Sequence, residues 1–172
     1  MFDDTFVEEL VVRRTTPLNI LIRVALVLGG VLFTMFGFLL IPYVFPLCLA
    51  IVCVLIYFLF RMQYVEYEYA FTNGDLDIDR IAGKRFRKRL ASIPESQIRV
   101  MAPYEAAYES EVRDYQVSRK LDVSASSRAA GRWFLIYEPY ENDFAFLVFQ
   151  PTEKLQDAMR KYLRGRMKGG QA

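Results

Sequence analysis

Three aspartates at alternate positions, Asp75, Asp77 and Asp79, have the spacing that opens a calcium-binding loop, in which carboxylates supply hard oxygen ligands. The loop needs a glycine next and a bidentate glutamate at its end, and this chain has Arg80 and Phe86 there. Alternate residues of a strand share one face. Solvent-facing strand positions, paired with a basic strand opposite, therefore explain the carboxylates better than calcium does. We predict no metal site and no cofactor.

The densest run of charge is basic and follows the aspartates directly. Its members, interrupted only by Phe86, are Lys84, Arg85, Arg87, Lys88 and Arg89. On a strand the three arginines would project to one side, while Phe86 and Leu90 would point inward. Such a patch could attract anionic headgroups of the inner leaflet, at about 1 kcal/mol per basic residue, or it could contact a partner. The alternative is a solvated strand edge whose charges prevent aggregation.

Two residue types that carry much of enzyme chemistry are missing or out of reach. The chain has no histidine, which removes the commonest metal ligand and the usual general base near neutral pH. Both cysteines, Cys48 and Cys53, lie inside a long apolar run, so the remainder has no disulfide framework and no thiol cluster. We find no phosphate-binding glycine loop and no nucleophile motif. We therefore predict that the protein is not an enzyme.

Aromatic residues are frequent between positions 133 and 149, where they alternate with acidic and apolar residues. Nucleic-acid binding would need aromatic and basic side chains together on one exposed face. We therefore predict no nucleic-acid partner. Core packing is the expected role of this group, which consists of Trp133, Phe134, Tyr137, Tyr140, Phe144, Phe146 and Phe149.

The elements that must position these residues begin with an uncharged stretch, since no Asp, Glu, Lys or Arg occurs between Val24 and Phe60. Two apolar runs, 18–41 and 44–60, are long enough to cross a bilayer, and Thr16 and Pro17 suit a helix start. The alternative is a buried core helix, but two apolar helices of this length are too large for the core of a domain this small. We predict a transmembrane helical hairpin over residues 17–62.

The distribution of Lys and Arg predicts the orientation of this hairpin. Arg13, Arg14 and Arg23 lie at its start, Arg61 and the basic run follow it, and the connecting turn has no basic residue. The positive-inside rule then predicts a multi-pass protein of the cell membrane with both termini in the cytoplasm. Arg23 is expected to extend to the headgroups, although a functional charge within the membrane is the alternative.

Gly30, Thr34 and Gly37 form a stripe of small residues along one face of the first helix. Such stripes let a neighbouring helix approach closely. The neighbour is either the second helix of the same hairpin or a second copy of the chain, so a homo-oligomer is possible on this pattern.

Residues 1–16 form an amphipathic segment with Phe2, Phe6, Leu10 and Val11 at helical spacing, and Thr5 with Glu8 matches a capping box. We predict a short helix here. It would lie at the membrane interface, on the soluble domain or on a partner.

From residue 64 to 168 the pattern is that of a separate β-rich domain. Residues 65–71 alternate with period two, and Asn73 and Gly74 are the strongest short signal for a hairpin turn. Gly83 allows a second reversal. Further candidate strands give about seven antiparallel strands, and an amphipathic helix follows at 152–164. These elements predict a curved sheet or barrel plugged by the final helix.

This order of elements resembles the pleckstrin-homology (PH) fold. The stretch VEYEYAFTNGDLDIDRIAGKRFRKRL, residues 65–90, and the step at Phe149, Gln150 and Pro151 resemble an uncharacterised family of small Gram-positive membrane proteins with two helices. The resemblance covers nearly the whole chain. It implies an α+β membrane protein, in which a two-helix transmembrane hairpin precedes a PH-like antiparallel β-barrel or sheet with a C-terminal helix.

That family brings no established activity, so the function must be argued from the chain itself. We expect a membrane-anchored, non-enzymatic interaction or scaffold module that binds the lipid bilayer and a protein partner on the cytoplasmic face. The alternatives are a direct sensor of anionic lipid and an accessory subunit of a larger membrane transport or envelope complex.

Overall fold

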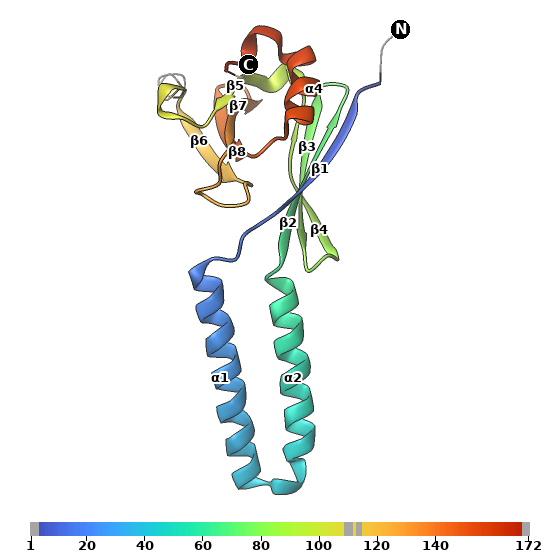
Figure 1. Ribbon diagram of the computed structural model, residues 1–172, viewed down its shortest axis with the longest axis vertical. Helices are drawn as coiled ribbons and strands as arrows, with labels where there is room; N and C mark the ends of the chain where they lie inside the picture. Colours follow the sequence, from blue (N-terminus) through green and yellow to red (C-terminus); the bar gives the residue numbers. More distant parts are fainter. Residues whose placement is uncertain (1–3, 109–111, 113–114, 170–172) are drawn as a thin grey trace. The chain divides into compact units, whose positions relative to one another are not determined.

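The computed structural model describes residues 4–108, 112 and 115–169. The chain divides into two compact units (Figure 1). One unit contains the helical hairpin and the turn at Ala82–Phe86, and the other contains most of the β-structure.

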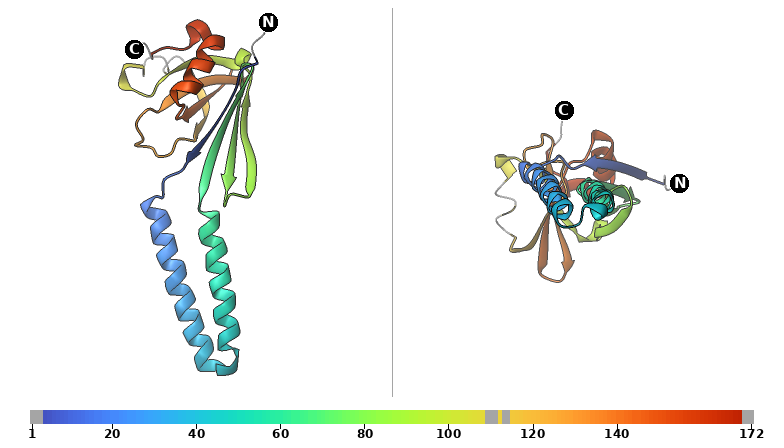
Figure 2. Two further views of the ribbon diagram at one scale, coloured as in Figure 1. Left: turned by 45° about the vertical axis from the view of Figure 1, so that its right-hand side comes forward. Right: turned by 90° about the horizontal axis from the view of Figure 1, so that it is seen from below.

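The hairpin unit consists of α1 (Pro17–Leu40) and α2 (Phe45–Met62), joined by a short 3-10 turn at Pro42–Val44. The hydroxyl of Thr16 accepts a hydrogen bond from the backbone N–H of Asn19 at 3.3 Å, and Pro17 is the first helical residue. The predicted helix start is therefore confirmed. Figures 1 and 2 show the two helices side by side. Both are long and apolar enough to cross a membrane, and almost none of their side chains is buried.

The predicted stripe of small residues lies on the side of α1 that faces α2. A Cβ atom at Gly30 would lie only 2.8 Å from Cγ1 of Val52 and 3.0 Å from Cδ1 of Ile56, so glycine permits this close approach. Thr34 is buried, and its hydroxyl donates to the carbonyl oxygen of Gly30. Gly37 lies at ordinary contact distance from Cys48. Of the two neighbours considered for the stripe, the second helix of the hairpin is the one in contact here.

The first sheet of the β-unit has the order β1-β2-β3-β4. Its strands are β1 (Phe6–Val12), β2 (Val65–Thr72), β3 (Asp75–Ala82) and β4 (Phe86–Ile93). At the turn between β2 and β3, Asn73 and Gly74 have φ values of 51° and 105°, the left-handed conformation that the sequence predicts. The backbone N–H of Asn73 also donates to the carbonyl oxygen of Thr5 at 3.0 Å.

The helix predicted within residues 1–16 is wrong, because the described part of this segment forms β1. It pairs antiparallel to β2, with Phe6 opposite Thr72 and Val12 opposite Glu66. Val7 is buried, whereas Phe6 and Leu10, which would have formed the apolar face of the helix, are exposed. Pairing with the edge of β2 therefore overrides the helical spacing.

The second sheet has the order β5-β7-β8-β6. Its strands are β5 (Ile98–Pro103), β6 (Val117–Asp122), β7 (Trp133–Tyr140) and β8 (Asp143–Phe149). β7 and β8 form an antiparallel hairpin, β5 pairs antiparallel to β7, and β6 pairs parallel to β8.

The arrangement corrects two predictions. The described strands form two four-stranded sheets instead of one closed barrel, and one pair is parallel although all were expected to be antiparallel. β6 and β7 run in opposite directions and leave one strand position between them, which β8 fills. Because β8 runs antiparallel to β7, it is parallel to β6.

The C-terminal helix α4 (Glu153–Leu163) confirms the prediction for 152–164 and buries Leu155, Ala158, Met159 and Leu163. The residue that ends the helix, Arg164, has a positive φ of 43° and directly precedes Gly165. At its start, the carboxylate of Glu9 on β1 accepts hydrogen bonds from the backbone N–H and the hydroxyl of Thr152. A negative charge there complements the helix dipole.

The core of the β-unit joins both sheets and α4. The rings of Tyr69 on β2 and Phe149 on β8 meet edge to face at 5.7 Å, and those of Phe71 and Tyr162 meet at 5.5 Å. The buried Tyr69 hydroxyl donates to the carbonyl oxygen of Val123 at 2.7 Å, and burial raises the pKa of this hydroxyl. Core packing is thus the role of most of the aromatic residues between positions 133 and 149, as predicted.

Candidate functional site

The basic run divides into two groups. Arg87 and Arg89 lie on β4 and form ion pairs with carboxylates of β2 and β3. Arg87 pairs with Glu68 and lies 3.5 Å from Asp79. Arg89 pairs at 2.8 Å with both Asp77 and Asp79. Two of the predicted aspartates are therefore partners of the basic strand, as the sequence favoured.

Burial makes this charge network asymmetric. Glu68 and Asp79 are only 6% and 4% exposed, whereas the two arginines are about half exposed. Burial raises the pKa of the Glu68 carboxyl, and Arg87 opposes this effect. The hydrogen bond to Asp79 is the main cause of the raised pKa of Arg89. The arginines are thus occupied in neutralising carboxylates. Among the described residues, no group of three acidic or cysteine side chains is arranged to hold a metal.

Lys84 and Arg85 lie instead in the turn between β3 and β4, which belongs to the hairpin unit. The guanidinium Nε of Arg61, on α2, donates to the carbonyl oxygen of Gly83 at 3.1 Å. The N–H of Gly83 donates to the carbonyl oxygen of Tyr64 at 2.8 Å, and Lys84 Nζ lies 5.3 Å from the centre of the Tyr64 ring. The turn is therefore attached to the C-terminal end of α2.

The expectation that Phe86 points inward is wrong, because this side chain is 59% exposed. The whole first half of β4 is exposed, so neither face of the strand is covered there. Leu90 is half-buried, and Lys88 is exposed without an ion pair to any described residue.

The remaining predicted arginines have separate environments. Arg23 on α1 donates through Nε to the side-chain oxygen of Gln63 at 3.0 Å and stacks over Phe60, so it reaches the C-terminal end of α2. In the β-unit, Arg13 donates through Nη1 to the hydroxyl of Tyr67 at 2.6 Å. Arg14 is exposed.

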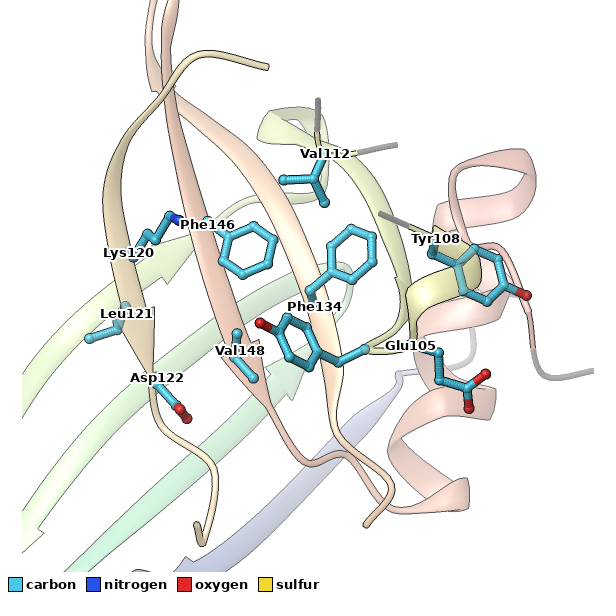
Figure 3. A pocket seen from close by; sticks show the side chains of 10 residues that line it. Glu105, Tyr108, Val112, Lys120, Leu121, Asp122, Phe134, Phe146 and Val148 are labelled. Atoms are coloured by element: carbon cyan, nitrogen blue, oxygen red, sulfur yellow. The ribbon is translucent and has the colours of Figure 1, made fainter. Parts of the chain in front are cut away.

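Sequence reasoning missed a pocket of about 540 Å³ on the second sheet (Figure 3). Phe134, Phe146 and Val148 form its floor, and Tyr108 and Val112 line another side. Val100, Ala102 and Ile136 extend the same apolar cluster. A pocket of this size with mostly apolar walls and a few polar groups is typical of binding sites.

Three charged residues line the same pocket, namely Glu105, Lys120 and Asp122. The Asp122 carboxylate already accepts hydrogen bonds from the N–H and the hydroxyl of Ser124, at 3.0 and 2.6 Å. Figure 3 shows Lys120 and Asp122 along one strand on one side of the two phenylalanine rings and Glu105 on the other side. The arrangement offers apolar contact together with charges of both signs.

A signal for this pocket is present in the sequence. In β7 and β8, Leu135 and Leu147 face the main core, and their neighbours Phe134 and Phe146 on the opposite face are apolar as well. A half-solvated sheet would carry polar residues on that face. A sheet with apolar side chains on both faces must be shielded from water on both faces.

Comparison with known proteins bears on the whole chain. Neither the curated proteins nor the solved structures contain a match. A family model matches residues 3–168, a range that includes the helical hairpin. This match confirms the resemblance that we drew from the order of elements and from residues 65–90. The chain therefore belongs to the family described as Bacterial PH-like domain (DUF6106).

Proposed function

We propose that this protein is a membrane-anchored, non-enzymatic interaction module, in which α1 and α2 span the cell membrane and the PH-like unit binds a protein partner at the cytoplasmic face. The observation that carries the proposal is the pair of long apolar helices whose side chains are almost entirely uncovered. A core helix of a soluble protein would be mostly buried.

The exposed apolar surface of the hairpin supports a bilayer as its environment. Burying a Leu, Ile or Phe side chain away from water contributes about 1.5–3 kcal/mol, and contiguous apolar patches of this kind mark membrane or protein contacts. The arrangement of Arg23 agrees with this environment, because its guanidinium meets Gln63 and Phe60 at the end of α2.

The pairing of β1 with β2 supports placing both ends of the hairpin on one side of the membrane. β1 ends at Val12, shortly before Pro17, and β2 begins at Val65, shortly after Met62. These neighbouring strands hold together the chain segments that enter and leave the hairpin. The basic residues near both ends then favour the cytoplasmic side.

Membrane anchoring is tested by washing isolated membranes with alkaline carbonate. We expect the full chain to remain in the membrane pellet, and its release into the supernatant would contradict the anchor. The interaction role is tested by crosslinking in intact cells, followed by isolation in mild detergent. We expect the same partner in replicate experiments, and repeated recovery of the chain alone would contradict this role.

A second candidate function, contact with anionic lipid, is favoured for only part of the predicted basic patch. The turn that carries Lys84 and Arg85 is hydrogen-bonded to Arg61 at the end of α2. If α2 spans the bilayer, its end lies at the headgroups. Arg87 and Arg89, in contrast, are already paired with carboxylates.

This second function is tested by extracting the full chain with its native lipids into polymer nanodiscs and measuring the ratio of anionic to zwitterionic lipid by mass spectrometry. Reversing both charges, Lys84→Glu with Arg85→Glu, should lower this ratio several-fold, because each basic residue contributes about 1 kcal/mol near the surface. Lys88→Glu, on the exposed strand, is the control and should change it little. An unchanged ratio in the double variant would contradict lipid contact at the turn.

A further inference from the structure

We propose that the pocket on the second sheet recognises an extended segment of a partner protein, which places one apolar side chain against Phe134 and Phe146 and a basic side chain near Glu105. This inference rests on the proposed interaction function and names the surface that performs it.

The floor of the pocket is apolar. The rings of Phe134 and Phe146 stack at 5.4 Å with an angle of 17° between their planes, and Val148 continues the surface on the same face. Tyr108 and Val112 pack against this cluster. The volume of about 540 Å³ lies within the range of about 300–1,000 Å³ of ligand pockets. It has room for a large side chain together with the neighbouring backbone.

The charges of the pocket favour a basic group beside the apolar anchor. β6 contributes one charge of each sign, Lys120 and Asp122, and Glu105 adds a further negative charge. The side chain of Glu105 is exposed and has no ion-pair partner among the described residues. Two of the three charged side chains that line the pocket are therefore carboxylates. They disfavour an anionic amphiphile, such as a fatty acid or an acidic phospholipid, and attract Lys or Arg.

The neighbouring edge of the sheet favours a peptide over a free amphiphile. β6 is the last strand of its sheet and pairs only with β8 in the described part of the chain. Its other edge therefore presents backbone N–H and C=O groups that an extended peptide can pair with. β6 also lines the pocket through Lys120, Leu121 and Asp122. A peptide added at this edge would direct alternate side chains toward the pocket face.

The test uses the full chain in the cells that normally make it, with photoreactive benzoylphenylalanine in place of Tyr108. Mass spectrometry of the crosslinked peptide identifies what occupies the pocket. We expect a segment of another protein that contains an apolar residue within a few positions of Lys or Arg. The same amino acid in place of Tyr140, which is 77% exposed and does not line the pocket, is the position control.

A charge variant separates a pocket ligand from a chance neighbour. Glu105→Lys should lower the crosslinking yield at position 108 about five-fold, since an attractive surface pair is lost. Glu141→Lys, an exposed carboxylate in the β7–β8 turn, should leave the yield unchanged. An equal yield in both variants would overturn the proposed charge recognition.

The remaining outcomes are also decisive. A lipid adduct, a crosslink to a second copy of this chain, a segment without a basic residue, or no adduct at position 108 would each overturn this inference. A partner that crosslinks elsewhere on the chain but never at position 108 would leave the interaction function standing and remove only the pocket.

Discussion

The two sheets of the β-unit have the same number of strands but differ on the face that turns away from their common core. In the β1-β2-β3-β4 sheet this face carries Glu68, Asp79 and the arginines of β4, which neutralise one another. In the β5-β7-β8-β6 sheet it carries Phe134 and Phe146 and holds a pocket. The charges of the first face are paired with one another, whereas the second face holds a pocket. The densest run of charge in the sequence therefore does not mark the position of the pocket.

The largest effect is expected from truncating the apolar face. Phe134 is 2% exposed and supports both the sheet and the pocket. Phe134→Ala should lower the free energy of unfolding by about 3–5 kcal/mol, through lost burial and a new cavity. Trp133 is the only tryptophan, and because it is buried its fluorescence reports denaturant unfolding of the β-unit.

Tyr140→Ala is the matched control for this variant, since that ring is exposed and its removal should change the unfolding free energy by less than about 0.5 kcal/mol. If the two variants were equally stable, the apolar face of the second sheet would not be a packed surface.

A smaller effect is expected from breaking the charged face. Arg87→Ala leaves the buried Glu68 carboxylate without its main cation, and we expect a loss of about 1–2 kcal/mol, limited by the solvent exposure of the arginine. Lys88→Ala, one position along the same strand, should cost almost nothing. The same fluorescence measurement compares them.

The double variant Arg87→Ala with Glu68→Gln should recover part of the stability lost in Arg87→Ala, because no buried carboxylate is then left unpaired. A double variant as unstable as the sum of its single changes would show that the ion pair is not the source of the effect.

The smallest effect concerns pH and compares one carboxylate of each sheet. Burial raises the pKa of Glu68 above its ordinary value of 4.5, so the folded state binds the proton more tightly than the unfolded state does. The contribution of this carboxyl to the free energy of unfolding therefore falls as pH rises from 4.5 through the raised pKa. Glu138, on β7, has a lowered pKa because it accepts hydrogen bonds from Asn142 and Arg99. Its contribution is present above 4.5 and is lost as pH falls through the lowered pKa.

We therefore expect Glu68→Gln and Glu138→Gln to change the slope of unfolding free energy against pH in opposite directions. Glu68→Gln should gain stability relative to the parent as pH rises above 4.5, and Glu138→Gln should lose its disadvantage as pH falls below 4.5. The measurement is denaturant unfolding at a series of pH values. Equal slopes in the two variants would contradict the assigned environments.

The features that local chemistry determines could be predicted from the sequence. The capped start of α1 at Thr16, the turn at Asn73 and Gly74 and the amphipathic helix α4 each depend on a few neighbouring residues. The family resemblance could also be read from residues 65–90.

The features that depend on distant pairing could not be predicted. The spacing of Phe6 and Leu10 is compatible with a helix, and only the open edge of β2 makes this segment a strand. The parallel pairing of β6 depends on where β8 enters the sheet. For the candidate site, the basic residues were found but their carboxylate partner on β2, Glu68, was not. The pocket is lined by four chain segments, the connection between β5 and β6 and the strands β6, β7 and β8, so it cannot be predicted from any single stretch of sequence.

The position of β1 has a consequence for how the protein is made. β1 leaves the ribosome before β2, with both apolar helices between them, and residues such as Arg13 and Tyr67 that meet in the final structure are 54 positions apart. Until α2 is followed by β2, β1 remains an unpaired strand. If the hairpin spans the membrane as proposed, the first sheet can form only when both helices have inserted, because a chain with one helix inserted would hold β1 and β2 on opposite sides of the bilayer.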